Sequence, residues 1–173
     1  KNNMVQSVII DAVRSPIGLK NGKLIGIRPD DLSTQIIVAL LERNNRLDPK
    51  FIEDLIFGCA FPEGNQGMLI SKGIAILAGL PDTTAGSVVN RFCGSSMDAV
   101  HQISTKIESG DIEVGIAGGV EDMFQSSPAL LSTSVTSVLY RRQRQRCLLA
   151  ALPNDFCQNA SLNYMIYETR VFS

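Results

Sequence analysis

The sequence predicts an α/β fold in which a mixed, mostly parallel sheet carries helices on its faces. Short apolar runs, typical of buried strands, alternate with segments of helical apolar spacing up to about residue 120. The chain is 45% hydrophobic and 19% charged, which is the balance of a globular protein with a buried core. Because strands and helices alternate, successive strands are expected to run parallel through crossover connections.

Four strands are predicted, each as a short apolar run bounded by turn-forming residues. The first is a continuous apolar run, which indicates a strand buried on both faces. The others are shorter and follow Gly-rich or Pro-rich turns. The predicted strands cover residues 7–13, 53–58, 87–90 and 113–117.

Three helices are predicted between these strands. The first, over residues 29–43, begins with a proline and two aspartates, which suit the start of a helix. The second covers residues 68–80 and has Gly79 near its end, and the third covers residues 93–109 and is closed by Gly110. The core face of the third helix is predicted to be Met97, Val100, Ile103 and Ile107.

Charge and hydropathy argue against two classes of partner. The formal net charge is −1, so there is no reason to expect nucleic acid. The basic run at residues 141–146 is typical of a solvated surface. No apolar run is long enough to span a bilayer, and residues 1–4 do not resemble a secretion signal. We therefore expect neither a nucleic-acid partner nor a membrane span.

The four cysteines are widely and irregularly spaced, without a Cys-x-x-Cys pair. This spacing predicts neither a metal site nor a disulfide scaffold. Reduced thiols in an intracellular compartment are expected, without a distinction between cytoplasm, mitochondrial matrix and peroxisome. The cysteines are Cys59, Cys93, Cys147 and Cys157.

Cys93 carries the strongest chemical signal in the sequence. A predicted strand turns sharply there and presents the cysteine where a helix begins. The N–H groups and partial positive charge of a helix N-terminus stabilise a thiolate and favour nucleophilic attack. The backbone N–H of Cys93 could also donate to an oxyanion. Taken alone, such a cysteine is more often a buried structural residue, so the neighbouring residues decide.

Residues 89–100 (VNRFCGSSMDAV) resemble the nucleophile motif of the thiolase family. Three other stretches resemble the same family in the same order, namely 10–18 (IDAVRSPIG), 57–60 (FGCA) and 116–123 (IAGGVEDM). The loop FGCAFPEGNQG that begins at Phe57 is most similar to 3-ketoacyl-CoA thiolases, with acetoacetyl-CoA thiolases close behind. One departure is Asp122, which stands where most relatives have Ser. Together these stretches place the resemblance over residues 7–124.

The resemblance implies a thiolase-like fold, built of two similar halves, with this chain as the N-terminal half. It implies an acyltransferase in which Cys93 forms an acyl thioester. The reaction is cleavage of a 3-ketoacyl-CoA by CoA, as in fatty-acid β-oxidation, or the reverse condensation. Acyl-CoA and coenzyme A are then co-substrates, and no tightly bound cofactor or metal is expected. Full-length members of the family are expected to be homo-oligomers.

The resemblance also implies catalytic groups that this sequence does not contain. In the family, a His and a second Cys from the C-terminal half transfer protons, and an Asn-containing motif places the oxyanion water. His101 is the single histidine, about 12 Å along the predicted helix from Cys93, so it is expected to be a surface or packing residue. Cys147 and Cys157 lack the Gly-rich surroundings of the second catalytic Cys. We therefore expect this truncated chain alone to lack turnover.

Two other functions stay open. The chain could be a non-catalytic thiolase remnant or interaction module that pairs with a full-length thiolase. It could also resemble a ketoacyl synthase, a condensing enzyme with the same fold and a nucleophilic cysteine. A smaller question concerns Gly118 and Gly119, which either line the site or turn the chain.

The sequence divides into residues 1–128, a thiolase N-terminal-like domain, and residues 129–173, an atypical tail. The tail loses the strand–helix alternation and is expected to pack poorly on the core. Residues 141–146 and 153–158, shifted by one base, permit sequences typical of a solvated loop and a helix start. A frameshift is therefore one hypothesis, a divergent loop region is the other, and the coding DNA distinguishes them.

Overall fold

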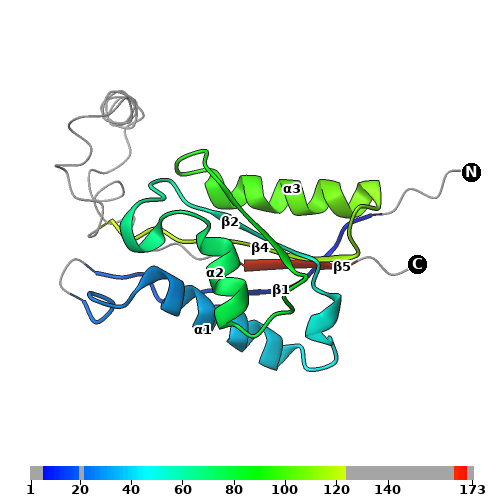
Figure 1. Cartoon of the computed structure of the whole chain (residues 1–173), viewed down its shortest axis with the longest axis horizontal. Helices are drawn as coiled ribbons and strands as arrows, with labels where there is room; N and C mark the ends of the chain where they lie inside the picture. The colour runs from blue at the N-terminus through cyan, green and yellow to red at the C-terminus, as the bar shows by residue number, and fades with distance from the viewer. Residues whose placement is uncertain (1–5, 20–21, 124–165, 171–173) are drawn as a thin grey trace, which may run out of the picture.

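A five-stranded mixed sheet forms the centre of the molecule (Figure 1). The computed structural model describes residues 6–19, 22–123 and 166–170. The strands lie in the order β1-β5-β4-β2-β3, so every connection between successive strands except β2–β3 and β4–β5 crosses over at least one other strand. The strands are β1 (Ile9–Val13), β2 (Asp54–Gly58), β3 (Ala85–Val89), β4 (Val114–Gly119) and β5 (Ile166–Arg170).

Four of the five strands run in one direction, which confirms the predicted mostly parallel sheet. β2 pairs in parallel with both β3 and β4, with Gly58 opposite Val89 and Gly119 at their carboxyl ends. β5 is antiparallel to β4 and to β1, so β1 points the same way as the three parallel strands. The carboxyl ends of β2, β3 and β4 therefore meet at one edge of the sheet, where ligand sites of open α/β sheets usually lie.

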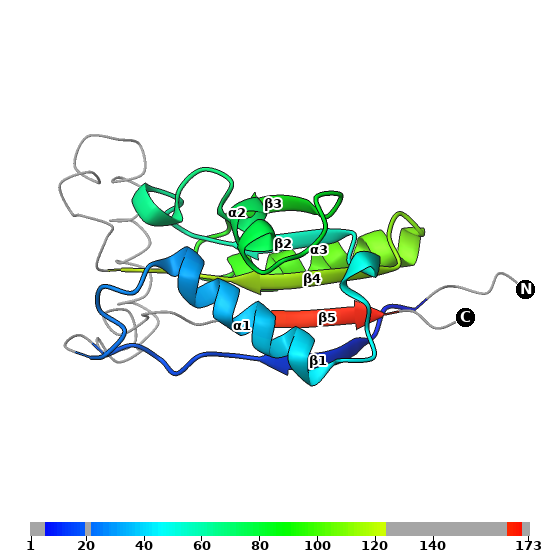
Figure 2. The ribbon, with the colours of Figure 1, turned by 60° about the horizontal axis from the view of Figure 1, so that its bottom comes forward.

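Helices cover both faces of the sheet, as Figure 2 shows. α3 (Ser95–Ser109) lies on one face, and α1 (Pro29–Arg43) and α2 (Ile70–Leu77) lie on the other. Two short 3-10 turns, η1 (Pro49–Phe51) and η2 (Gly64–Gln66), precede and follow β2. The predicted caps are confirmed: Pro29 begins α1, and the helices α2 and α3 are followed by glycines in the left-handed region.

The period-two alternation of β2 divides the core into two clusters. Leu55 and Phe57 point toward α1 and α2, where they pack with Ile37, Leu40 and Ile74. The intervening Ile56 packs on the other face with α3, in a smaller cluster. That smaller cluster contains Ile56, Ala99, Ile103, Ile107 and Ala117.

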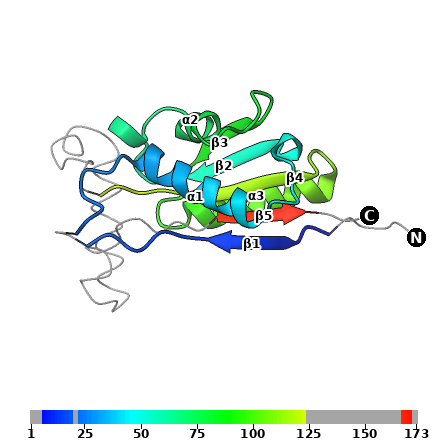
Figure 3. The same cartoon turned by 90° about the horizontal axis from the view of Figure 1, so that it is seen from below.

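Two predictions about burial are wrong. The first strand was expected to be buried on both faces, but Ile9 is 55% exposed and Ile10 is 41% exposed. β1 lies at the edge of the sheet, beyond β5, where less of the molecule covers it (Figure 3). Met97 was expected in the core but is half exposed, because Ala99 and not Met97 faces the sheet in the first turns of α3.

The fifth strand was not predicted. β5 comes from the stretch after residue 129, and it fills the place between β1 and β4. The remainder of that stretch lies outside the described residues, so the frameshift hypothesis stays a prediction. In the part of the chain that the structure describes, no helix is long and apolar enough to cross a bilayer.

Candidate active site at the carboxyl edge of the sheet

Cys93 lies at the predicted junction, in the turn that joins β3 to α3, and it is exposed. The predicted helix start is two residues early, because α3 begins at Ser95 with Gly94 as its N-cap. Cys93 therefore precedes the helix cap and belongs to the turn itself. The preceding residue, Phe92, has a φ of 51°, a left-handed conformation that is rare for side chains other than Gly, Asn and Asp.

Hydrogen bonds from two flanking polar side chains hold this turn. The Asn90 Oδ1 accepts from the Phe92 N–H at 3.0 Å. The Ser95 hydroxyl accepts from the Arg91 N–H at 2.9 Å and donates to the Phe92 carbonyl at 2.6 Å. These bonds satisfy main-chain groups of the two residues before Cys93 and fix the left-handed Phe92. We define residues 90–95 as the nucleophile turn.

One ion pair joins the turn to the helix that follows. The Arg91 Nε lies 3.1 Å from the Asp98 carboxylate, and Asp98 also accepts from Gln102 at 2.9 Å. Arg91 is largely exposed, so the pair contributes little to stability. Its effect is to hold the guanidinium group of the nucleophile turn against the first turn of α3.

Two glycines let the first turn of α3 lie directly on the strand ends. A Cβ added to Gly58 would overlap the backbone of Ser95 and Ser96, and one added to Gly119 would overlap the Ser96 side chain. Gly118 and Gly119 are the last two residues of β4 and are buried, so the interpretation that they merely turn the chain is wrong. Gly119 instead supports the helix that carries the nucleophile turn.

A buried polar cluster lies behind the nucleophile turn, between the loops that follow β2 and β4. The Glu121 carboxylate accepts from the Ala60 N–H at 2.6 Å and from the Gln66 side-chain amide at 2.7 Å. Gln66 also donates to the Phe61 carbonyl at 2.8 Å and accepts from the Asp122 N–H at 2.7 Å. Every polar atom of the Gln66 side chain is thus used to join the two loops.

The second described cysteine, Cys59, faces this cluster and is chemically unlike Cys93. Cys59 is 1% exposed, and its Sγ lies 4.0 Å from the Glu121 carboxylate. Burial, with the nearby Glu121 charge, raises the pKa of Cys59 to about 12. Burial also raises the pKa of Glu121, an effect that its hydrogen bonds with Ala60 and Gln66 oppose. Cys59 therefore stays a thiol at neutral pH.

His101, the only histidine, is exposed on α3, as predicted. Because His101 lies further along the surface of α3, the helix does not bring its side chain to the nucleophile turn. The residues described contain no group of three His, Cys, Asp or Glu side chains arranged to hold a metal ion.

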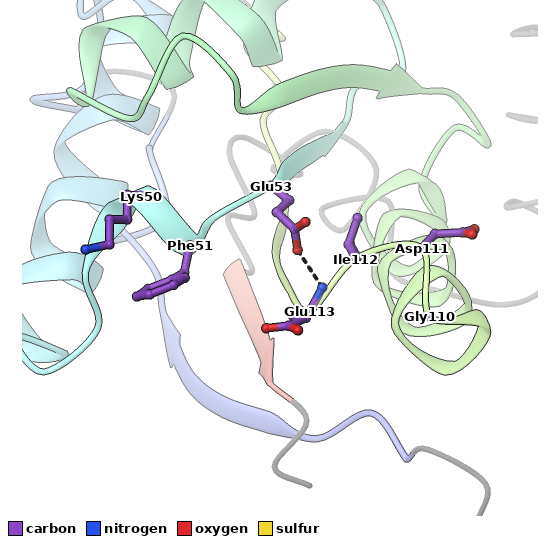
Figure 4. Close-up of a pocket in the computed structure, with 7 residues that line it drawn as sticks. All are labelled: Lys50, Phe51, Glu53, Gly110, Asp111, Ile112 and Glu113. Carbon is purple, nitrogen blue, oxygen red and sulfur yellow. Dashed lines mark hydrogen bonds between the residues drawn. The ribbon is translucent and has the colours of Figure 1, made fainter.

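A cleft of about 300 Å³ lies at the opposite end of the sheet, before β2 and β4 begin (Figure 4). Three carboxylate side chains are among its lining, and the Glu53 carboxylate accepts from the Glu113 N–H at 2.5 Å. An acidic lining repels an anionic ligand such as a CoA thioester. The lining residues are Lys50, Phe51, Glu53, Gly110, Asp111, Ile112 and Glu113.

Sequence reasoning placed Cys93 at the strand-to-helix junction but missed the residues behind it. Gln66 lies in a predicted polar turn and gave no signal of burial, yet it is 1% exposed. Glu121 follows a glycine pair at the end of a predicted strand, which was the one available indication that it lies at the carboxyl edge. Asn90 is the first residue of the nucleophile turn, and its Asx-type bond to Phe92 could have been expected from its position.

Comparison with known proteins agrees with this geometry. A family model described as "Thiolase, N-terminal domain" matches residues 7–161. The chain is 48% identical over 117 residues to a 3-ketoacyl-CoA thiolase of Alcanivorax borkumensis, covering 67% of this chain and 30% of that relative. It is 46% identical over 121 residues to a 3-ketoacyl-CoA thiolase of Shewanella denitrificans, covering 69% of this chain and 31% of that relative.

A solved structure gives the same result for the fold. The acetyl-CoA acetyltransferase of Bacillus anthracis matches with a TM-score of 0.67 and 33% sequence identity, over 73% of this chain and 32% of that one. The chain spans about a third of the length of the curated relatives it matches. The family match extends past residue 128, although residues 124–161 lie outside the described part. With a family match over most of its length and the thiolase-like sheet, this chain belongs to the thiolase family through its N-terminal domain.

Proposed function

We propose that Cys93 is the acyl-accepting nucleophile of a thiolase-type acyltransferase that acts on 3-ketoacyl-CoA substrates. The observation that carries this proposal is the exposed position of Cys93 in a turn fixed by Asn90 and Ser95, directly before α3. Family membership supports the reaction class, and relatives named 3-ketoacyl-CoA thiolase support the substrate class.

In the proposed reaction, the Cys93 thiolate attacks the 3-keto carbonyl carbon of the substrate. The bond between C2 and C3 breaks, the electron pair stays on C2, and protonation there releases acetyl-CoA. The thiolate of a second CoA then attacks the acyl thioester, which releases the shortened acyl-CoA and returns Cys93 as thiolate. A backbone N–H of the turn, that of Cys93 first, is the proposed donor to the oxyanion in each step.

The proton transfers require a general acid and base, and His101 is placed poorly for either role. We therefore propose that this chain alone performs at most the acylation of Cys93 and does not turn over. The same observation favours a second candidate function, a non-catalytic thiolase-family protein that acts through binding. The two candidates differ in whether Cys93 accepts an acyl group.

Peptide mass spectrometry of the purified chain after incubation with acetyl-CoA or acetoacetyl-CoA tests the proposal. An acyl adduct on Cys93 that is released by added CoA is the expected result. Cys93→Ala, which should carry no adduct, is the control for the site. An adduct on Cys59, or no adduct on the folded chain, would reject the acyl-transfer proposal and favour the non-catalytic candidate.

A further inference from the structure

We propose that Glu121 and Gln66 are positioning residues, which hold the nucleophile turn in place through Asn90. The importance of the turn rests on the proposed function of Cys93. The hydrogen-bond chain itself stands on the structure and is tested separately. We call the side chains of Glu121, Gln66 and Asn90, with the Ala60 peptide between them, the brace.

The first half of the brace joins two loops that follow different strands. Glu121 follows β4, and its carboxylate accepts from the Ala60 N–H at 2.6 Å and the Gln66 amide at 2.7 Å. Gln66 belongs to the loop after β2. Its side-chain oxygen accepts from the Asp122 N–H, which belongs to the same loop as Glu121. The bond between Asp122 and Gln66 is buried and the two bonds of Glu121 are partly buried, so water competes less for them than at the open surface.

The second half of the brace passes from this buried cluster to the nucleophile turn. Ala60 donates its main-chain N–H to Glu121, and the Ala60 carbonyl accepts from the Asn90 Nδ2 at 2.9 Å. The Oδ1 of the same Asn90 side chain accepts from the Phe92 N–H. One side chain therefore bonds both to the fixed loop and to the strained residue that precedes Cys93.

An aromatic contact runs beside this hydrogen-bond chain. The rings of Phe61 and Phe92 meet edge to face with centroids 6.1 Å apart. Phe61 follows Ala60 directly, so both connections start from the loop that Glu121 and Gln66 hold. A left-handed Phe92 requires such support from its surroundings.

The use of a carboxylate here is informative. Burying a charged group is unfavourable even when it is hydrogen-bonded, and apolar residues of similar volume often fill such space with equal or greater stability. Glu121 provides two acceptor oxygens that fix two donors at once, which an apolar residue cannot do. This geometry indicates a role in placing the loops rather than in filling the core.

Hydrogen exchange of the Phe92 and Ser95 amides tests the brace without any activity. In Glu121→Gln, one of the two acceptors becomes a donor, so we expect turn exchange to be about fivefold faster, the factor that one ordinary hydrogen bond provides. Asn90→Ser keeps a short-range acceptor for Phe92 but is too short to reach Ala60, so it should show the same effect. Glu63→Gln, an exposed site on the same loop, is the matched control and should not change exchange.

The combination of variants identifies the route. If Glu121 acts through Asn90, the double variant should exchange no faster than either single variant, because the same connection is already broken. Independent, multiplied effects would overturn the proposal. Equal acceleration at the Ile56 amide in the middle of β2 would also overturn it, because that result means general destabilisation.

The rate of Cys93 alkylation by iodoacetamide at one fixed pH gives a readout of where the turn holds Cys93. The charged groups nearest in the turn and in α3, Arg91 and Asp98, are unchanged in every variant. A displaced turn moves Cys93 away from the α3 N-terminus, whose N–H groups favour nucleophilic attack by a cysteine, so alkylation slows. A variant that only lowers global stability leaves this rate unchanged, because Cys93 is already exposed in the native chain.

We expect alkylation of Cys93 to be slower in Glu121→Gln and in Asn90→Ser than in the wild-type chain, and unchanged in Glu63→Gln. Equal or faster alkylation in either variant would overturn the positioning role. An absent acyl adduct on the wild-type chain would reject the proposed function alone, since exchange and alkylation are measured without acyl-CoA.

Discussion

At the carboxyl ends of β2 and β4, glycines let α3 pack directly against the strands, whereas at their amino ends a partly buried ion pair lies beside an acidic cleft. At the carboxyl edge, Gly58 and Gly119 bring α3 against the strands, and a buried cluster fixes the loops. At the amino edge, Lys106 pairs with the buried Asp54 at 2.5 Å, beside the acidic cleft. The comparison teaches that backbone contact with the first turn of α3 is built at the carboxyl edge, which carries Cys93, while the amino edge contains a partly buried charge pair.

The largest expected effect is from Gly58→Ala. The added methyl group would overlap the backbone of Ser95 and Ser96, which cannot move aside by a side-chain rotation. We expect a loss of about 3 kcal/mol in the free energy of unfolding, measured by urea denaturation. Gly73→Ala is the control. A Cβ at this exposed position of α2 meets nothing within 4 Å, so the variant should be more stable by about 0.5–1 kcal/mol. Equal stability of the two variants would contradict the close packing of α3 on the carboxyl edge.

At the amino edge, Lys106→Met leaves the Asp54 carboxylate buried without its cation. The side chain of Asp54 is 3% exposed, and its Oδ1 already has no hydrogen-bond partner. We expect a loss of about 2 kcal/mol, less than for a fully buried pair because Lys106 is 42% exposed.

Two controls sharpen this prediction. Lys50→Met breaks the exposed pair with Asp48 and should leave the free energy of unfolding unchanged within error. Asp54→Asn added to Lys106→Met should recover part of the loss, because the unpaired charge is then absent. If Lys106→Met is as mild as Lys50→Met, the ion pair does not stabilise the amino edge. In that event the two edges would differ more strongly, because the amino edge would have no stabilising ion pair between Lys106 and Asp54.

A smaller effect is expected in the pH dependence of stability. Because the pKa of Glu121 is raised in the folded chain, the folded state binds this proton at a higher pH than the unfolded state. The contribution of Glu121 to stability is therefore complete below its ordinary value of 4.5 and is lost as the pH rises through the raised value.

Urea denaturation of wild type and Glu121→Gln across this pH range measures the effect. The free energy of unfolding of wild type, relative to Glu121→Gln, should increase as the pH falls from neutral toward 4.5. Glu63→Gln controls for the loss of one carboxyl group on the same loop. A difference that is constant with pH, or that decreases toward acid, would mean that burial does not dominate the ionisation of Glu121.

Local pattern was sufficient to predict most elements and the position of Cys93, because apolar period and turn residues are visible in sequence. α1 occupies the predicted residues 29–43, and Cys93 lies at the predicted strand-to-helix junction, two residues before α3 begins. The family resemblance, confirmed by the match over residues 7–161, supplied the reaction class. Neither the periodicity nor the composition could have supplied it.

What sequence could not predict depends on partners distant along the chain. The sequence of β1 predicts a buried strand, but the strand lies at the edge of the sheet and is therefore partly exposed. Ile166–Arg170 contains β-favouring residues, which were a usable signal, yet pairing with β1 and β4 is a tertiary choice. Gln66 is polar in sequence but buried in the fold, and Glu121 is half-buried, because each finds its hydrogen-bond partners only after two loops meet.

The central claim is that the carboxyl edge presents Cys93 as a reactive nucleophile and keeps Cys59 as an inert thiol. Time-resolved iodoacetamide labelling of the native chain, read by peptide mass for each cysteine, tests it most directly. Cys93 should react at least about a hundredfold faster than Cys59, because labelling of Cys59 requires the core to open. In urea the two rates should become similar. Equal or faster labelling of Cys59 in the native chain would contradict the account.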